Sequence, residues 1–132
     1  MSWSFLDDED VNYVMSDGEK VYVAANVQLM GGADTATSTL SSDFGGAYAV
    51  INGSLAGTYT VRLGTDSTGS GAHVDIGLRG DIFGSSSGLI LKGVSSELNN
   101  RGTIRGDGEA VLFQATSGEG YGSVRNTGEI IG

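Results

Sequence analysis

Five charged residues in the second half of the chain have the chemistry of an acid–base site. They are two carboxylates that could transfer protons and three guanidinium groups that could stabilise negative charge: Asp75, Asp81, Arg79, Arg101 and Arg105. Residues of these types more often belong to the solvated face of a strand, and nothing else in the sequence selects one reaction. We therefore predict that the protein is not an enzyme.

Residues that bind metals or cofactors are scarce. His73 is the only histidine and cysteine is absent, which argues against a transition-metal site. The acidic run from Asp7 to Asp10 could collect a calcium ion, although consecutive carboxylates usually repel one another and stay hydrated. No nucleophile elbow, phosphate loop or dinucleotide fingerprint is present. The sequence predicts no cofactor and leaves calcium binding by the acidic run open.

The composition indicates one domain with many tight turns. The 132 residues include 23 Gly and no Pro, a mixture that suits an all-β fold because Gly enters turns without steric cost. A net charge of −9, from 7 Lys+Arg against 16 Asp+Glu, argues against nucleic acid or an anionic membrane surface as partner. No apolar run is long enough for membrane insertion, and the first residues do not form a standard signal peptide.

A repeat of 22 to 27 residues organises the chain. Each of five segments has an apolar anchor residue two positions before a glycine: the anchors are Leu29, Leu55, Ile82, Ile104 and Ile130. The glycines that close the segments are Gly31, Gly57, Gly84, Gly106 and Gly132. Six positions before the anchor lies a small or apolar residue, predicted to form an inward column: Val23, Ala49, Ile76, Leu98 and Val124. Glycine two positions before the anchor, as at Gly102, is expected at a corner with positive φ.

A second short apolar run follows the closing glycine of most units. These runs occupy residues 58–63, 88–93 and 109–114, with a weaker one at 35–40. Short strands without helices cannot bury their own apolar side chains, whereas stacked units pair like strands in parallel and align like side chains. The period is too short for a propeller blade. The sequence therefore predicts an all-β fold, a single right-handed parallel β-helix (β-solenoid) of about five rungs.

The two ends of the predicted solenoid differ. Residues 20–132 contain the repeats, and residues 1–19 are predicted to form an N-terminal cap, since terminal rungs expose unpaired strand edges. In this cap the aromatic side chains of Trp3 and Phe5 would cover the first rung. The sequence stops on the final letters of a repeat, which suggests a piece of a longer protein or an end that stacks on a neighbour.

The segments ELNNRGTIRG (97–106) and SVRNTGEIIG (123–132) resemble the N-x-G-x-I-x-G rungs of bacterial secreted parallel β-helices. Such rungs occur in autotransporter passenger regions and in type I-secreted, RTX-associated exoproteins. The resemblance covers the chain from about residue 20 onward. It implies a secreted or cell-surface location. It does not carry over calcium binding, because the nearest stretch to the RTX nonapeptide has Ser70 in place of its second glycine.

Regular rungs and an uncapped end favour a non-catalytic structural module that self-associates by end-to-end stacking into a homo-oligomer. The candidate interface residues on the C-terminal edge are Val124, Asn126 and Ile130. An alternative is an adhesin-like surface that binds a glycan or a host ligand. Its candidate residues share repeat columns: Tyr22 with Tyr48, and Arg79 with Arg101. A polysaccharide lyase or hydrolase is the less favoured third option.

Overall fold

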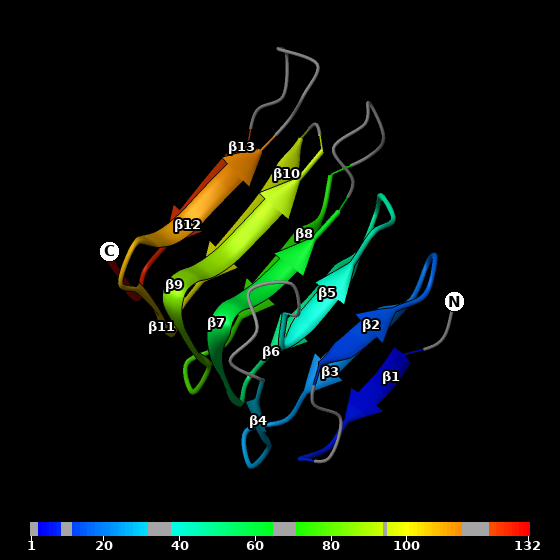
Figure 1. Ribbon diagram of the computed structural model, residues 1–132, viewed down its shortest axis with the longest axis horizontal. Helices are drawn as coiled ribbons and strands as arrows, with labels where there is room; N and C mark the ends of the chain where they lie inside the picture. The colour runs from blue at the N-terminus through cyan, green and yellow to red at the C-terminus, as the bar shows by residue number, and fades with distance from the viewer. Residues whose placement is uncertain (1–2, 9–11, 32–37, 65–70, 94, 115–121) are drawn as a thin grey trace.

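The computed structural model describes residues 3–8, 12–31, 38–64, 71–93, 95–114 and 122–132. Within them, parallel strands form two sheets (Figure 1). Sheet A contains, in spatial order, β1 (Trp3–Leu6), β3 (Lys20–Val23), β6 (Tyr48–Ile51), β8 (His73–Ile76), β10 (Ser96–Asn100) and β13 (Gly122–Asn126). Sheet B contains β2 (Tyr13–Met15), β5 (Leu40–Ser42), β7 (Ser54–Leu63), β9 (Asp81–Lys92), β11 (Thr103–Gly106) and β14 (Glu129–Ile131). Two further strands join sheet B: β4 (Gln28–Met30) pairs with β7, and β12 (Glu109–Gln114) pairs with β9.

The chain alternates between the two sheets, and each turn adds a rung to the stack. A turn contributes one strand to sheet A and then one or two strands to sheet B, each paired in parallel with its counterpart one turn away. Figure 1 shows this progression from the N-terminal to the C-terminal end of the stack. The predicted all-β parallel solenoid is confirmed. No helix in the described part of the chain has the length and hydropathy needed to span a bilayer.

The anchor residues form the predicted column inside sheet B. Leu29 pairs with Leu55, Leu55 with Ile82, Ile82 with Ile104, and Ile104 with Ile130. The first four are at most 1% exposed. Because parallel strands in register place identical positions above one another, one apolar residue per unit is enough to build a continuous core.

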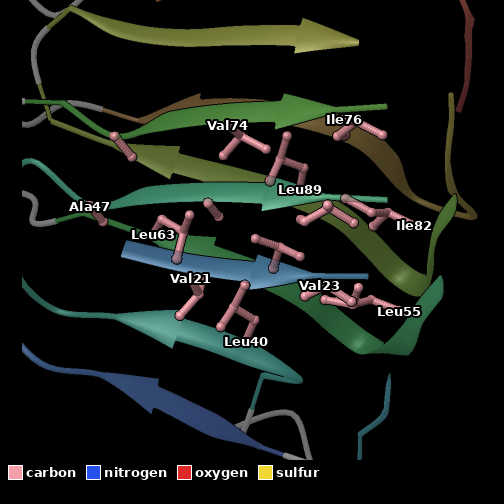
Figure 2. Packing of buried hydrophobic residues seen from close by; sticks show 14 of the residues in the cluster. Val21, Val23, Leu40, Ala47, Leu55, Leu63, Val74, Ile76, Ile82 and Leu89 are labelled. Carbon is pink, nitrogen blue, oxygen red and sulfur yellow. The ribbon is translucent and has the colours of Figure 1, made fainter. Parts of the chain in front are cut away.

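The second strands also occupy the predicted segments. Residues 58–63, 88–93 and 109–114 fall largely in β7, β9 and β12, where Val61 pairs with Leu89 and Leu63 with Leu91. Figure 2 shows side chains such as Val74 from sheet A and Leu63 and Leu89 from sheet B meeting between the sheets. Half of the weak strand predicted at 35–40, residues 35–37, lies outside the described residues, and the described strand there is β5.

The inward positions of sheet A form two adjacent columns, where the sequence predicted one. The first contains Val21, Ala49, Val74, Leu98 and Val124. The second contains Leu6, Val23, Ile51, Ile76, Asn100 and Asn126. The predicted column mixes the two because the corner between the sheets has four residues at 24–27 and 77–80, but only two at 52–53, 101–102 and 127–128. Two additional residues in a corner return the strand side chains to the same face of the sheet. The prediction therefore assigned some residues to the wrong column, although it placed them correctly on the inner face.

Close approach of backbone groups, and not positive φ, makes glycine necessary at these corners. A Cβ atom on Gly102 would overlap the carbonyl oxygen of Gly80, and one on Gly128 would overlap the carbonyl oxygen of Gly102. The described glycines with positive φ lie elsewhere: Gly18, Gly46, Gly64 and Gly93. The expected positive φ at Gly102 is therefore wrong. The rungs stack so tightly at this corner that no side chain fits between them.

The N-terminal residues extend both sheets. Strand β1 pairs with β3 and β2 pairs with β5, so this segment adds strands to the stack where the sequence predicted a covering cap. Leu6 and Met15 point inward and are buried. Trp3 and Phe5 are 39% and 73% exposed, on the outer face of sheet A. Since successive side chains of a strand alternate between its faces, these two aromatic residues cannot share the inner face with Leu6.

Candidate functional site

The C-terminal rung, formed by β13 and β14, carries core positions that are uncovered. Val124 is 47% exposed, whereas Leu98, its partner in the preceding rung, is 1% exposed. Ile130 is half-buried, whereas its partner Ile104 is fully buried. Strands β13 and β14 are the last members of their sheets among the described residues. One side of this rung therefore presents both apolar side chains and a strand edge.

The third predicted interface residue belongs to an amide ladder inside the solenoid. Asn100 is 1% exposed, and its Nδ2 donates to Oδ1 of Asn126 at 2.8 Å and to the carbonyl oxygen of Glu129 at 3.1 Å. The backbone N–H of Gly102 donates to Oδ1 of Asn100 at 3.1 Å. In the earlier rungs, the residues in the column of Asn100 are apolar, as at Ile51 and Ile76. The buried amide is therefore satisfied by the neighbouring rung, as in-register stacking allows.

A network on the outer face of sheet A, named here the outer cluster, links three rungs through Tyr48, His73, Asp75, Glu97 and Asn99. The hydroxyl of Tyr48 donates to Oδ2 of Asp75 at 2.7 Å, and Nδ2 of Asn99 donates to Oδ1 of Asp75 at 2.8 Å. Nε2 of His73 lies 3.0 Å from Oδ1 of Asp75, and its Nδ1 lies 3.2 Å from Oε2 of Glu97. The rings of Tyr48 and His73 stack with centroids 4.4 Å apart.

The outer cluster holds Asp75 ionised and Tyr48 protonated. Burial alone would raise the pKa of Asp75, but the hydrogen bonds from Tyr48, Asn99 and His73 bring that pKa below its usual value. The hydrogen bond to Asp75, together with burial and nearby negative charge, raises the pKa of Tyr48 to about 12. Both ring nitrogens of His73 have a carboxylate partner. These contacts connect β6, β8 and β10, so the cluster joins three successive rungs on the outer face of sheet A.

Aromatic side chains continue this face toward β1. The rings of Trp3 and Tyr48 meet edge to face at 5.5 Å, and Nζ of Lys20 lies 5.6 Å from each centroid. Phe5 contacts Tyr22 at 5.6 Å. The predicted pairing of Tyr22 with Tyr48 is wrong, because Tyr48 pairs with Lys20 and the two tyrosines lie in adjacent columns.

A groove of about 460 Å³, named here the axial groove, runs along the stack beside the outer cluster. One wall is the outer column of sheet A: Val50, Asp75, Asn99 and Arg125, which pair in register. The other wall is made by the first residue of each corner: Asn52, Gly77, Arg101 and Thr127. The groove is thus built by four successive turns of the chain.

The predicted acid–base residues do not converge. Asp75 and Arg101 line the axial groove. Asp81 and Arg105 are exposed on strands β9 and β11 of the other sheet. Arg79 lies at an exposed corner and does not line the groove, so its predicted partnership with Arg101 does not form a common site.

Sequence reasoning missed four of the polar residues in the groove. They are Asn52, Asn99, Arg125 and Thr127. Aligning the units on the strands of sheet A, instead of on the anchors, would have placed Asp75, Asn99 and Arg125 in one column. The four-residue corner after Asp75 hid this relationship, because Asn99 and Arg125 precede corners of two residues.

The acidic run near the N-terminus has a structural contact in its described part. Oδ1 of Asp8 accepts a hydrogen bond of 2.8 Å from the backbone N–H of Gln28. Glu9 and Asp10 lie outside the described residues. Among the residues that are described, no three acidic, histidine or cysteine side chains gather as a metal site.

Comparisons of the chain with protein-family models, with curated proteins and with solved structures find no match. The function must therefore be argued from the geometry of the C-terminal rung, the outer cluster and the axial groove.

Proposed function

We propose that this chain is a non-catalytic structural module of a secreted or cell-surface protein, and that it associates with a second copy of itself through the C-terminal rung. One observation carries the proposal: Val124 is 47% exposed in a column whose preceding member, Leu98, is 1% exposed. At this rung, a side chain of an inward column is exposed to water.

Apolar side chains and strand-edge backbone groups of the C-terminal rung both favour contact with a partner. Complete burial of an exposed aliphatic side chain contributes about 1.5–3 kcal/mol, and the partly exposed Val124 and Ile130 on the inward columns would each gain part of this in an interface. The exposed edges of β13 and β14 offer backbone donors and acceptors to a further strand. The N-terminal strands β1 and β2 are also terminal members of their sheets, but their inward side chains Leu6 and Met15 are buried.

The inward columns favour a closed dimer over a filament. Stacking β13 on β1 of another copy in the same register would set the amide of Asn126 against Leu6 of the partner subunit and leave part of it unsatisfied. A two-fold arrangement centred on Val124 instead pairs this residue with its own copy. Asn126 then lies opposite Gly122 of the partner subunit, where the amide is not enclosed by an apolar side chain.

The outer cluster supports a structural role over a catalytic one. Its hydrogen bonds join β6, β8 and β10, and each polar atom of Asp75 is engaged by a neighbouring side chain. The resemblance of the rungs to those of secreted β-helices supports a location outside the cell. A structural module that associates with a second copy of itself is therefore the function that these observations favour.

Sedimentation equilibrium across a range of protein concentrations tests the association. We expect a monomer–dimer equilibrium that strengthens as salt rises, because two copies with a net charge of −9 repel each other less when screened. Val124→Lys should weaken the dimer at least about ten-fold, since a charge must be buried in the interface. Ser123→Lys, with the same added charge on the outer face of the same strand, should have a much smaller effect.

Two results would contradict the proposal. One is a monomer at every concentration and salt level. The other is an equal effect of the two lysine substitutions, which would show that charge alone, and not the inward columns of the C-terminal rung, controls association.

A further inference from the structure

We infer that the axial groove of sheet A is a binding site for a linear oligosaccharide that carries carboxylate groups. This inference goes beyond the self-association proposed above and concerns a different surface, the outer face and corner of the stack. Four features of the groove support this inference. They are its shape, its local charge, its hydrogen-bonding side chains and the backbone N–H groups of its wall, which already donate hydrogen bonds within the solenoid.

The shape of the groove suits a short linear chain. Its two walls repeat in four successive turns, and rungs about 4.8 Å apart give it a length of roughly 14 Å. Its volume of about 460 Å³ is typical of small-ligand sites, which span about 300–1,000 Å³. A ligand along the stack would meet equivalent positions of the walls at each rung. A polymer of similar units matches such a repeating surface.

The charge of the groove is opposite to that of the whole protein. The chain has a net charge of −9, yet two exposed guanidinium groups, of Arg101 and Arg125, line the groove. Asp75 is the acidic residue among its lining residues, and both of its oxygens already accept hydrogen bonds within the outer cluster. Arginine binds carboxylates through paired, planar hydrogen bonds. The groove therefore favours an anionic ligand on an otherwise acidic surface.

The amide side chains in the walls present acceptors for hydroxyl groups. Nδ2 of Asn52 donates to the hydroxyl of Tyr22 at 2.9 Å, and Nδ2 of Asn99 donates to Asp75. Each of these amides keeps its Oδ1 as an acceptor and a second N–H as a donor for the hydroxyl groups of a ligand. The hydroxyl of Thr127 adds a further donor and acceptor in the same wall. Hydroxyl donors beside carboxylates are the chemistry of an acidic sugar.

The backbone of the corner wall is already used by the solenoid. The N–H groups of Asn52, Gly77, Arg101 and Thr127 donate to carbonyl oxygens of the preceding rung at 2.8 to 2.9 Å. A peptide bound as an added strand would need such groups to be unpaired. Recognition in this groove must come from side chains. That condition suits a saccharide, whose polar groups lie around its ring, better than an extended acidic peptide.

Isothermal titration of the 132-residue protein with trigalacturonate tests the inference. The protein is kept at a concentration at which it is monomeric, so that the result does not depend on dimer formation. Neutral maltotriose and the peptide tri-glutamate serve as comparison ligands. We expect trigalacturonate to bind and both comparison ligands to bind at least about ten-fold more weakly, because each lacks one of the two kinds of hydrogen-bonding group.

Matched arginine variants locate the site. Arg101→Gln and Arg125→Gln should each reduce the affinity for trigalacturonate about ten-fold or more, through loss of a charge-assisted pair. Arg79→Gln removes the same charge at an exposed corner one rung earlier, outside the groove, and should change the affinity less than about two-fold. Unchanged thermal midpoints of the variants would show that the fold is intact.

Three results would overturn the inference. Absence of trigalacturonate binding to the folded monomer would exclude the proposed ligand class. Equal binding of tri-glutamate would identify an acidic-peptide site instead of a saccharide site. Binding that is unaffected by Arg101→Gln and Arg125→Gln would place any saccharide site elsewhere on the surface.

Discussion

Asn100 donates a hydrogen bond of 2.8 Å from its Nδ2 to Oδ1 of Asn126, inside the solenoid and across two successive rungs. Asn100 is 1% exposed, whereas the earlier members of its column, such as Ile51 and Ile76, are apolar. A buried amide is costly unless every polar atom finds a partner. The pair therefore connects the C-terminal rung to the rest of the stack and makes the alignment of these two rungs specific.

A double-mutant cycle tests this pair. Asn100→Ala leaves the N–H of Gly102 and the carbonyl of Glu129 without their partner, and should lower the free energy of unfolding by about 1–3 kcal/mol. Asn126→Ala should cost less because this side chain is exposed. Urea unfolding of both single variants and of the double variant should give a coupling energy of about 1 kcal/mol. Additive effects would mean that the two amides do not stabilise each other.

Substitution at the stacked corner tests the backbone approach described for Gly102. Gly102→Ala should lower the thermal midpoint clearly and reduce stability by about 1–3 kcal/mol, because its Cβ would overlap the rigid carbonyl of Gly80. Gly132→Ala is the matched control, since a Cβ there meets no atom closer than 3.4 Å. If both substitutions are equally mild, the rungs are further apart at the corner than the structure shows.

The register of sheet B can be tested at Ile104. This side chain is fully buried in the anchor column, so Ile104→Asp should unfold the domain by placing an unpaired charge in the core, at a cost of several kcal/mol. Arg105→Asp introduces the same carboxylate on the exposed face of the same strand and should keep the fold. Circular dichroism during heating distinguishes the two. An unchanged midpoint for Ile104→Asp would show that the register is wrong.

The outer cluster predicts a loss of stability at alkaline pH. The pKa of Tyr48 is raised to about 12 in the folded protein, above its value of about 10 in an unfolded chain. The folded state therefore holds this proton more tightly, and the resulting stabilisation is complete below about pH 10 and disappears as the pH rises toward 12. Tyr48→Phe keeps the ring and should flatten stability over this window. Tyr59→Phe, outside the cluster, should retain the alkaline loss, and a wild-type profile in Tyr48→Phe would show that the hydrogen bond to Asp75 is not its source.

Absence of catalysis is a separate prediction. Since Asp75 lies on sheet A and Asp81 on sheet B, the carboxylates of the sequence-derived candidates face different sides of the molecule. We expect no release of unsaturated products or reducing ends from pectin, alginate or hyaluronan. Turnover that disappears on Asp81→Ala would contradict the prediction and require a site on sheet B.

The sequence by itself determined the repeat and therefore the class of fold. One apolar anchor and one closing glycine per unit, at Leu55 and Gly57 for example, predict stacked parallel strands, because such short strands bury their apolar side chains only against copies of themselves. The inner face of each strand was predictable for the same reason, since strand side chains alternate with a period of two. The apolar character of the inward positions Val124 and Ile130 also followed from the repeat.

Only the tertiary structure decided which residues lie side by side on the outer face. Corners of two and of four residues both return the chain to the next sheet, and the sequence does not mark which is used. Spacing from the anchor therefore misplaced Tyr22 relative to Tyr48, and it separated Asp75 from Asn99 and Arg125. Neighbours in a solenoid lie one full turn apart along the chain, so an outer cluster or a groove exists only after backbone hydrogen bonds between rungs have set the register.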